Sequence, residues 1–512
     1  MTQVVPSTPQ IWTISGADCS GGAGIAADIK TGQCFNVEVC HLITANTVQN
    51  GLKLTAINPI DVDVLEQQAQ ALLEIKTPNA IKVGLIASQE QLNWLIKLIT
   101  SVKNRHPQLK VIVDPVGHAT VGGKLSLVEP QALAKLLPLT DIITPNLLEA
   151  QSLASSTSIN TSKLAKIIAS NGVKSVIVKG GHSEDKDACQ DVCIHQLSSL
   201  DTACTSLGYA NYSLTSARVN TAYSHGGGCS FATAMAALIA QGYLVRDAFM
   251  LSKTFITQGL VENEGKNDFY GAFKQLPLNY YRAIFPEVSE EISKTYQNIS
   301  FPSLNISRDG TQSLGLYPVV DSIAWLKLLL PLNLNIIQLR IKDVDDETLE
   351  KLIIEAVELC KNTSTRLFIN DYWQLAIKHK AYGVHIGQED LADTDLAKIE
   401  ASGIRLGIST HGCYEFIKSQ QLKPSYLAIG AIFPTNTKDM TGQIQGVDNL
   451  SKLLKLSTDI PVVAIGGINL KNVEEVWQIG VDSVAVVTAI TKANSPENAV
   501  AAFQALTTDS TS

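Results

Sequence analysis

The chain has 512 residues, of which 45% are hydrophobic and 17% charged, and its formal net charge is −8. This length predicts two large domains or about three of average size, and the apolar content excludes a disordered chain. The negative charge argues against a general nucleic-acid or acidic-membrane surface, and no apolar run reaches the roughly 18 residues of a membrane span. Nine cysteines without a C-x-x-C pair favour reduced thiols in the cytoplasm.

The first half alternates strand-like apolar runs with helical stretches from Ile11 to about Ala283. The strand-like runs are Ile11–Ser15, Ala80–Leu85, Val111–Val113, Ile142–Thr144 and Val176–Lys179. This order predicts a largely parallel sheet with helices on both faces, in a domain that spans residues 1–285. The polar stretch that follows, with weak periodicity, predicts a linker over residues 286–312.

A glycine-rich turn stands out within the first domain. Ser224-His225-Gly226-Gly227-Gly228-Cys229 precedes an apolar run that predicts a helix. Three glycines let the backbone approach a ligand closely, and the first N–H groups of the helix then form an anion site that suits phosphate. We expect Cys229 in the first helical turn, where the helix dipole lowers the pKa of a thiol. A lipase-type oxyanion loop would also need a G-x-S-x-G elbow, which the chain lacks.

The second half shows eight apolar runs separated by helical stretches, over residues 313–512. The runs are Leu316–Val320, Ile336–Ile341, Arg366–Ile369, Gly383–Ile386, Ile404–Ile408, Tyr426–Ile432, Pro461–Ile465 and Ser483–Val487. Eight strand–helix units in about 200 residues predict a small (β/α)8 TIM barrel. Polar residues follow nearly every run, and barrel active sites lie at that end of the strands. We therefore expect a second site there.

Seven motifs of the first half resemble the hydroxymethylpyrimidine/phosphomethylpyrimidine kinase family, in the family's order. They are ISGADCSGGAGIAADIKT, ITANTVQN, KVGLIAS, VIVDPV, ITPNLLEA, VIVKGGHSED and VNTAYSHGGGC. The resemblance implies a ribokinase-like three-layer α/β/α domain. It also implies that ATP phosphorylates 4-amino-5-hydroxymethyl-2-methylpyrimidine, and then its monophosphate, to the pyrophosphate.

The resemblance also implies roles for individual residues. Gln49 offers the donors and the acceptor that an aminopyrimidine edge requires, and Gly16, Ala23 and Leu85 would line the same pocket. Nucleotide and Mg²⁺ binding falls to Asn146, Glu149 and Lys179. The transferred phosphate would lie on the Gly226–Gly228 backbone, with Cys229 as base or polar partner of the attacking oxygen.

Several positions depart from the kinase pattern. The family has Thr where the chain has Gly227, and its lysine and aspartate are missing from Ala119–Gly123. These departures leave two alternatives open. Only the second half of the chain would be active beside a degraded, pyrimidine-binding kinase half, or the kinase half would act as a precursor sensor.

The second half resembles thiamine phosphate synthase from LGLYPVVDS onward. The motifs are QLRIKD, RLFINDYWQLAIKH, YGVHIGQEDL, LGISTH, IFPTNTK, VAIGGI and VAVVTAI. The resemblance implies that the pyrimidine pyrophosphate condenses with 4-methyl-5-(2-phosphoethyl)thiazole and releases pyrophosphate. The chain as a whole is thus expected to be a bifunctional transferase of thiamine biosynthesis.

Three sets of residues are expected to build the synthase site. The pyrimidine pyrophosphate would be bound by Gln338, Leu339, Arg340, Ile341, Lys342, Asn370, Ser409 and Lys438. The thiazole phosphate would be bound by Thr435, Asn436, Thr437, Gly466, Gly467, Val487 and Thr488. Asp371 and Asp390 are hard oxygen ligands that would hold Mg²⁺. We expect His385 to be packed or hydrogen-bonded, whereas the role of His411 stays open. The expected partners are small molecules, with Mg²⁺ as cofactor and ATP as co-substrate, and homo-oligomerisation stays open.

Overall fold

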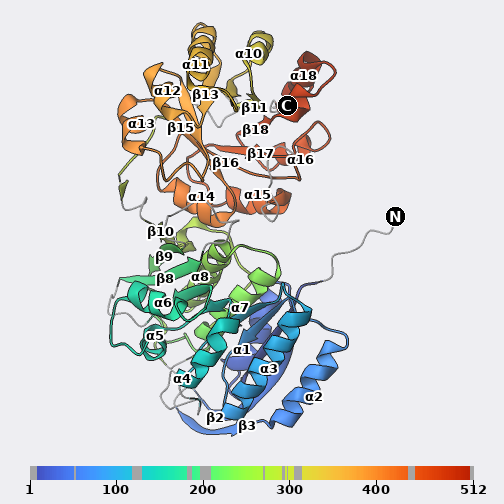
Figure 1. Cartoon of the computed structure of the whole chain (residues 1–512), viewed down its shortest axis with the longest axis vertical. Helices are drawn as coiled ribbons and strands as arrows, with labels where there is room; N and C mark the ends of the chain where they lie inside the picture. Colours follow the sequence, from blue (N-terminus) through green and yellow to red (C-terminus); the bar gives the residue numbers. More distant parts are fainter. Residues whose placement is uncertain are drawn as a thin grey trace. The chain divides into compact units, whose positions relative to one another are not determined.

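The computed structural model describes residues 8–50, 53–117, 128, 130–181, 187–196, 209–268, 271–290, 295–296, 298–304, 314–435 and 444–507. The chain forms two compact units, the first ending at Glu290 and the second beginning at Glu291 (Figure 1). None of the helices in these ranges has the length and apolar character needed to cross a membrane.

A ten-stranded sheet forms the centre of the first unit, in the order β10-β9-β8-β7-β6-β5-β4-β1-β2-β3. The strands are β1 Gln10–Asp18, β2 Glu38–Gln49, β3 Leu54–Pro59, β4 Ala80–Val83, β5 Lys110–Val113, β6 Ile142–Ile143, β7 Ser175–Val178, β8 Ala188–Gln196, β9 Tyr209–Ala217 and β10 Glu287–Ser289. Strands β2, β1, β4, β5, β6 and β7 pair in parallel, which confirms the largely parallel sheet, and all of them except β2 correspond to the runs named above. The antiparallel strands β3, β8, β9 and β10 were not predicted.

Helices cover both faces of this sheet, which confirms the three-layer architecture (Figure 1). One face carries α1 Gly24–Cys34, α7 Gly227–Ala240 and α8 Val245–Val261. The other carries α2 Val62–Leu73, α3 Gln89–Arg105, α4 Pro130–Leu133, η1 Ala134–Leu139, α5 Leu147–Leu153 and α6 Thr161–Ala169, while η2 Arg282–Ile284 precedes β10. Alternation along β1 explains the layers, because Trp12 and Ile14 join the core with α3, whereas Thr13 faces α1.

A buried ion pair joins the sheet to the helices that carry the glycine turn. Lys82 of β4 lies 2.8 Å from Asp28 of α1, and both side chains are fully buried. The hydroxyl of Thr233, in α7, donates to the other oxygen of Asp28 at 2.8 Å, and Thr13 donates to Asp28 as well. Because its oxygens accept several hydrogen bonds, the buried carboxylate is compensated and holds α1 and α7 against the strands.

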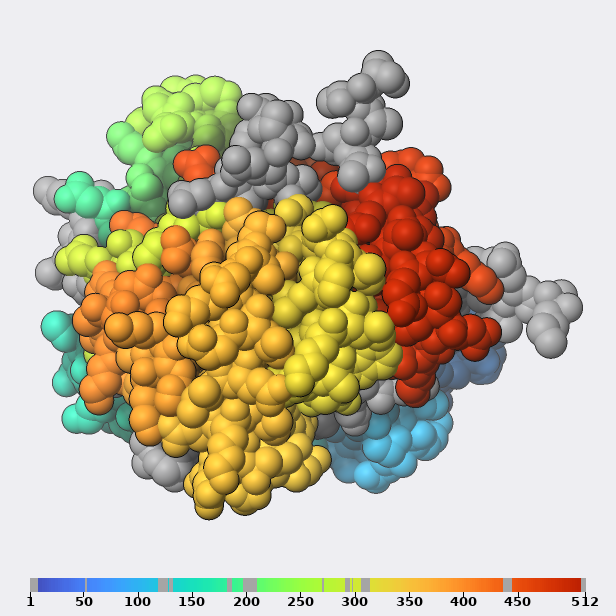
Figure 2. Space-filling view, turned by 90° about the horizontal axis from the view of Figure 1, so that it is seen from above, coloured from blue at the N-terminus to red at the C-terminus, as the bar shows by residue number. Residues whose placement is uncertain are grey.

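A closed barrel of eight parallel strands forms the second unit, which confirms the predicted count. The strands are β11 Gly315–Val320, β12 Ile336–Leu339, β13 Arg366–Asn370, β14 Gly383–Ile386, β15 Arg405–Thr410, β16 Tyr426–Ile429, β17 Val462–Ile465 and β18 Ser483–Val486. The helices around it are α10 Ile323–Leu329, η3 Leu330–Leu332, α11 Asp346–Cys360, α12 Trp373–Lys378, α13 Leu396–Ser402, α14 Cys413–Gln420, α15 Gly446–Leu454, α16 Val473–Trp477, α17 Thr488–Thr491 and α18 Pro496–Thr507. Ring closure brings β18 beside β11, and the yellow and red segments of the barrel adjoin in Figure 2.

Residues at both ends of the expected linker, 286–312, take part in folded units. Glu287–Ser289 form β10, which pairs with β9 of the first sheet. Phe301 donates its N–H to the carbonyl of Lys423, and Leu304 lies in the core of the barrel. Residues 305–312 lie outside the described part of the chain.

Candidate active sites

The glycine turn lies at the start of α7 and meets the loop that follows β1. Gly226 is the N-cap residue with a φ of 84°, a left-handed conformation that favours glycine. A Cβ at this position would lie 1.8 Å from the carbonyl oxygen of Gly22, so no other residue fits. The N–H of Gly227 donates to the carbonyl of Ser224 at 3.0 Å, and the next two N–H groups of α7 lack an acceptor within the helix and are available to an anion.

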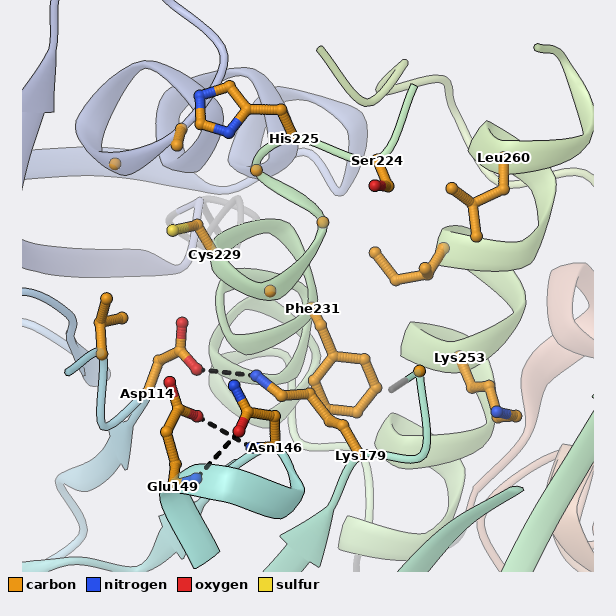
Figure 3. A pocket seen from close by; sticks show the side chains of 18 of the residues that line it. Asp114, Asn146, Glu149, Lys179, Ser224, His225, Cys229, Phe231, Lys253 and Leu260 are labelled. Atoms are coloured by element: carbon orange, nitrogen blue, oxygen red, sulfur yellow. Dashed lines mark hydrogen bonds and ion pairs between the residues drawn. The ribbon is translucent and has the colours of Figure 1, made fainter. Parts of the chain in front are cut away.

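All the residues predicted for the kinase site line one pocket, whose volume is about 400 Å³ (Figure 3). They are Gly16, Ala23, Gln49, Leu85, Asn146, Glu149, Lys179, Gly226, Gly228 and Cys229. The residues come from several strand ends and from the starts of α1, α5 and α7, which are far apart in sequence. The parallel sheet brings them together because the carboxyl ends of its strands meet at one edge.

The expectation that the helix dipole lowers the pKa of Cys229 is wrong. Burial raises the pKa of this thiol to about 11, and the carboxylates of Asp28 and Asp114 add to the effect, against the ammonium of Lys82. Cys229 does lie in the first turn of α7, as expected. Its thiol is protonated at neutral pH, so it can donate a hydrogen bond but is a poor base.

An ion pair that the sequence did not predict lies below Cys229 in Figure 3. Lys179, directly after β7, is 2.9 Å from Asp114, directly after β5, and the two side chains point toward one another. Burial lowers the pKa of Lys179, but Asp114 and Glu149 outweigh this effect and raise it overall, so the ammonium stays charged. Asp114 lies in the VIVDPV motif, at the end of a predicted strand. This position was the signal in the sequence that could have identified Asp114 as a site residue.

Asn146 and Glu149 form a capping box at the start of α5. The N–H of Glu149 donates to the Asn146 side chain at 2.9 Å, and the N–H of Asn146 donates to the Glu149 carboxylate at 2.8 Å. Burial raises the pKa of Glu149 to about 7, which Lys179 opposes and Asp114 reinforces. Part of the oxygen set proposed for Mg²⁺ is therefore already held in place by the helix start.

A second unpredicted pair joins the glycine turn to the β1 loop. His225 lies 2.8 Å from Asp18, whose carboxylate also accepts from the backbone N–H groups of Gly22 and Ala23. Burial alone would raise the pKa of Asp18, yet the hydrogen bonds from His225 and Ser20 hold it well below its usual range. The carboxylate thus fixes both loops at the pocket.

The rim of the pocket beside α8 contains a third unpredicted pair. Lys253 of α8 lies 3.0 Å from Asp191 of β8, and both side chains are buried. Asp191 also accepts the N–H of Gly180 at 2.7 Å, directly after Lys179. This pair therefore holds the end of β7 against α8. No motif in the sequence marks it, since β8 was not predicted as a strand.

The barrel gathers the described synthase residues at the carboxyl ends of its strands. Gln338 and Leu339 end β12, Asn370 ends β13, and Ser409 lies near the end of β15. The residues that follow strand ends are Arg340, Ile341, Lys342, Asp371, Asp390, Thr435, Gly466, Gly467, Val487 and Thr488. Asn436, Thr437 and Lys438 lie outside the described residues.

Asp371, one of the two predicted Mg²⁺ ligands, directly follows β13. Its φ is 65°, a left-handed backbone that asparagine and aspartate tolerate better than most residues, and its carboxylate accepts from the Asn370 amide. Burial raises the pKa of Asp371 to about 6, and the negative charge of Asp390 acts in the same direction. In the described ranges no group of three or more His, Cys, Asp or Glu side chains is arranged to hold a metal ion.

The two histidines of the barrel differ in their partners. His385 is buried and lies 2.8 Å from both the Tyr426 hydroxyl and the Ser409 hydroxyl, as expected for a hydrogen-bonded residue. Burial lowers its pKa to about 4. His411, whose role the sequence left open, lies 2.9 Å from the buried carboxylate of Glu415.

Comparisons with known proteins assign each half of the chain to a family. The model of the phosphomethylpyrimidine kinase family matches residues 18–273, and that of the thiamine monophosphate synthase family matches residues 316–490. A thiamine-phosphate synthase of Yersinia pseudotuberculosis is 54% identical over 190 residues, which are 37% of this chain and 88% of the relative.

Two solved structures are similar to the first half. Pyridoxal kinase of Staphylococcus aureus, in complex with ADP, is 30% identical, with 55% of this chain and 98% of that chain covered and a TM-score of 0.47. Phosphomethylpyrimidine kinase of Clostridium difficile is 28% identical, with 49% and 99% covered and a TM-score of 0.40. On the family matches, the chain belongs to the phosphomethylpyrimidine kinase family in its first half and to the thiamine monophosphate synthase family in its second.

Proposed function

We propose that the chain catalyses two consecutive steps of thiamine phosphate formation. The first unit transfers phosphoryl groups from ATP to 4-amino-5-hydroxymethyl-2-methylpyrimidine and to its monophosphate. The second unit condenses the resulting pyrophosphate with 4-methyl-5-(2-phosphoethyl)thiazole, forming thiamine phosphate and releasing pyrophosphate. The observation that carries this proposal is the presence, in one chain that belongs to both families, of a glycine-turn pocket and a barrel rim rich in phosphate-binding groups.

In the kinase pocket, each set of residues has a separate task. The Gln49 amide reads the aminopyrimidine edge, with Gly16, Ala23 and Leu85 as the pocket wall. The first N–H groups of α7 hold the transferred phosphoryl group, and the charged Lys179 stabilises it. The protonated Cys229 donates a hydrogen bond and is no base. Of the two roles first expected of it, base or polar partner of the attacking oxygen, only the second remains.

Asn146 and Glu149 fit a bound Mg²⁺, which would neutralise phosphate charge and orient the phosphates of ATP. Their oxygens lie in the same pocket as Asp114, and burial, together with the charge of Asp114, raises the pKa of Glu149. A cation would relieve this repulsion, so the donor set suits one. The capping box leaves little conformational entropy to be lost when Asn146 and Glu149 bind.

In the barrel, the leaving pyrophosphate needs positive charge. Arg340 and Lys342 follow β12 and supply it, and Gln338 and Asn370 add amide donors. Asp371 and Asp390 fit a Mg²⁺ that would neutralise the leaving group, since burial and the negative charge of Asp390 both raise the pKa of Asp371 and a cation would offset both effects. Pyrophosphate oxygens and water would complete its coordination. The Gly466–Gly467 backbone and Thr488 would hold the thiazole phosphate at the corner after β17 and β18.

The test is a coupled assay on the intact chain. Pyrimidine alcohol, thiazole phosphate and Mg-ATP are mixed with the protein, and thiamine phosphate is measured by mass spectrometry. We expect product formation that depends on ATP. A parallel reaction receives pyrimidine pyrophosphate without ATP. Product in the second reaction but not in the first would show that only the synthase half is active and would overturn the kinase part of the proposal.

A further inference from the structure

A row of polar side chains crosses the interior of the barrel. The Gln338 amide nitrogen of β12 lies 3.3 Å from the Tyr317 hydroxyl of β11, which lies 2.9 Å from the Tyr426 hydroxyl of β16. Tyr426 lies 2.8 Å from Nδ1 of His385 in β14, whose Nε2 lies 2.8 Å from the hydroxyl of Ser409 in β15. Five strands thus contribute one residue each to a continuous hydrogen-bonded row.

Nearly the whole row is shielded from water. Tyr317 and Tyr426 are 1% and 0% exposed, and Gln338 and His385 are 5% and 6% exposed. Phe368 packs edge-on against both tyrosines, and the His385 ring stacks on Tyr426. Ser409 is partly exposed at the carboxyl end of its strand. Because a buried donor without an acceptor is costly, the buried O–H groups of Tyr317 and Tyr426 each need an acceptor.

The direction in which the hydrogen bonds of the row are donated follows from counting its donors, beginning at Gln338. An amide nitrogen donates and cannot accept, so Tyr317 receives a hydrogen bond from Gln338. The O–H of Tyr317 then has only the Tyr426 oxygen as an acceptor among the described residues. The O–H of Tyr426 is left with Nδ1 of His385 as its acceptor.

The direction continues to the active-site end. Since Nδ1 accepts from Tyr426, a neutral His385 carries its proton on Nε2 and donates to the Ser409 oxygen. The opposite tautomer, or an imidazolium, would place an N–H on Nδ1 and leave the Tyr426 proton without an acceptor in the described part of the chain. The Ser409 oxygen therefore accepts from His385, and the Ser409 proton has no acceptor among the residues that the structure describes.

We propose that this row aims the Ser409 hydroxyl as a hydrogen-bond donor at an acceptor atom of the synthase substrate. Tyr317, Tyr426 and His385 are positioning residues, which act through Ser409 and do not touch the substrate. The inference rests on the proposed synthase function for its substrate, whereas the direction of the row is a property of the protein alone. The two parts can therefore be tested separately.

The direction is tested by the histidine tautomer. The full chain, which has nine histidines, is labelled with ¹⁵N-histidine. The resonances of His385 are those that are missing from the spectrum of the His385→Gln variant. At neutral pH we expect a neutral ring protonated on Nε2, which ¹⁵N shifts and two-bond couplings distinguish. A ring protonated on Nδ1, or an imidazolium, would overturn the inference whether or not the chain makes thiamine phosphate.

The link to catalysis is tested by a matched pair of variants. In His385→Gln, the amide nitrogen reaches about as far as Nε2 and can still donate to Ser409. In His385→Asn, the shorter amide reaches only about as far as Nδ1 and therefore cannot donate to Ser409. We expect His385→Asn and Ser409→Ala to lower synthase kcat/KM by about tenfold, with His385→Gln retaining most of it. Equal losses in His385→Gln and His385→Asn, with their folding shown intact by circular dichroism, would refute the positioning role.

Discussion

Cys229 shows how a single residue can have the predicted place and the opposite chemistry. Its position in the first turn of α7 follows from the glycine turn and the apolar run behind it. Its pKa does not, because burial and the nearby carboxylates outweigh the helix dipole. Asp28 and Asp114 lie far from Cys229 in sequence, so only the folded sheet reveals their effect.

The raised pKa predicts slow alkylation of Cys229. With a pKa of about 11, the thiolate fraction rises tenfold per pH unit, and the iodoacetamide reaction should keep accelerating between pH 8 and 10. An ordinary thiol would be half ionised near pH 8.5, and its rate would level off above about pH 9.5. Peptide mass spectrometry gives the rate at this position, with Cys229→Ser as the control for peptide assignment. A rate that is already half of its maximum near pH 8.5 would contradict the raised pKa.

Two neighbouring glycines should respond differently to substitution. A Cβ at Gly226 would overlap the Gly22 carbonyl, whereas a Cβ at Gly227 meets no atom within 4 Å. We expect Gly226→Ala to lower kinase kcat/KM by about 100-fold through displacement of the turn. Gly227→Thr, which restores the family's residue, should have a kinase kcat/KM that is equal to that of the parent or up to about threefold higher. ADP release measures both, and an equal loss in the two variants would argue against this reading of the turn.

At the scale of elements, the sequence predicted the parallel centre of the sheet and every barrel strand, because buried parallel strands are continuous apolar runs. The antiparallel strands β3 and β8–β10 were missed, since their sequences mix polar and apolar residues, as in β8, where Gln190 and Asp191 interrupt the run. The pairs Asp114–Lys179 and Lys253–Asp191 were missed for another reason. Each joins two elements, and no spacing within one element marks such a pair.

The Asp18–His225 pair, which joins elements 207 residues apart, should stabilise the first unit. Asp18→Asn is expected to lower the free energy of unfolding by about 2 kcal/mol at pH 7, since several hydrogen bonds to a charged group weaken. The pKa of Asp18 is lower in the folded state than in the unfolded state. Its contribution is therefore fully present above about pH 5 and declines as the pH falls further.

Urea unfolding at pH 7, 5 and 4 measures this difference, with the exposed Asp63→Asn as the matched control. The gap between the parent and Asp18→Asn should be the same at pH 7 and 5 and smaller at pH 4. A gap that grows as the pH falls would contradict the sign of the shift.

For the whole molecule, the two sites should be chemically independent. The described residues that line the kinase pocket all belong to the first unit, and the described synthase residues all belong to the second. Asp371→Asn should therefore lower the condensation by at least about 100-fold, through loss of a ligand to the leaving-group cation, and leave ATP-dependent formation of pyrimidine pyrophosphate unchanged. Gly226→Ala should lower the formation of pyrimidine pyrophosphate and leave the condensation unchanged. The exposed Asp346→Asn, an acidic residue of α11 in the barrel unit, serves as the control.

A mixing experiment completes this prediction. Neither variant alone should convert pyrimidine alcohol to thiamine phosphate at the parent's rate, but an equal mixture of Asp371→Asn and Gly226→Ala should do so once pyrimidine pyrophosphate has accumulated in solution. Both products are followed by mass spectrometry over time, so a lag in thiamine phosphate should match the rise of the free intermediate. Loss of both activities in either variant, or a mixture that makes free pyrimidine pyrophosphate and yet no thiamine phosphate, would contradict independent sites.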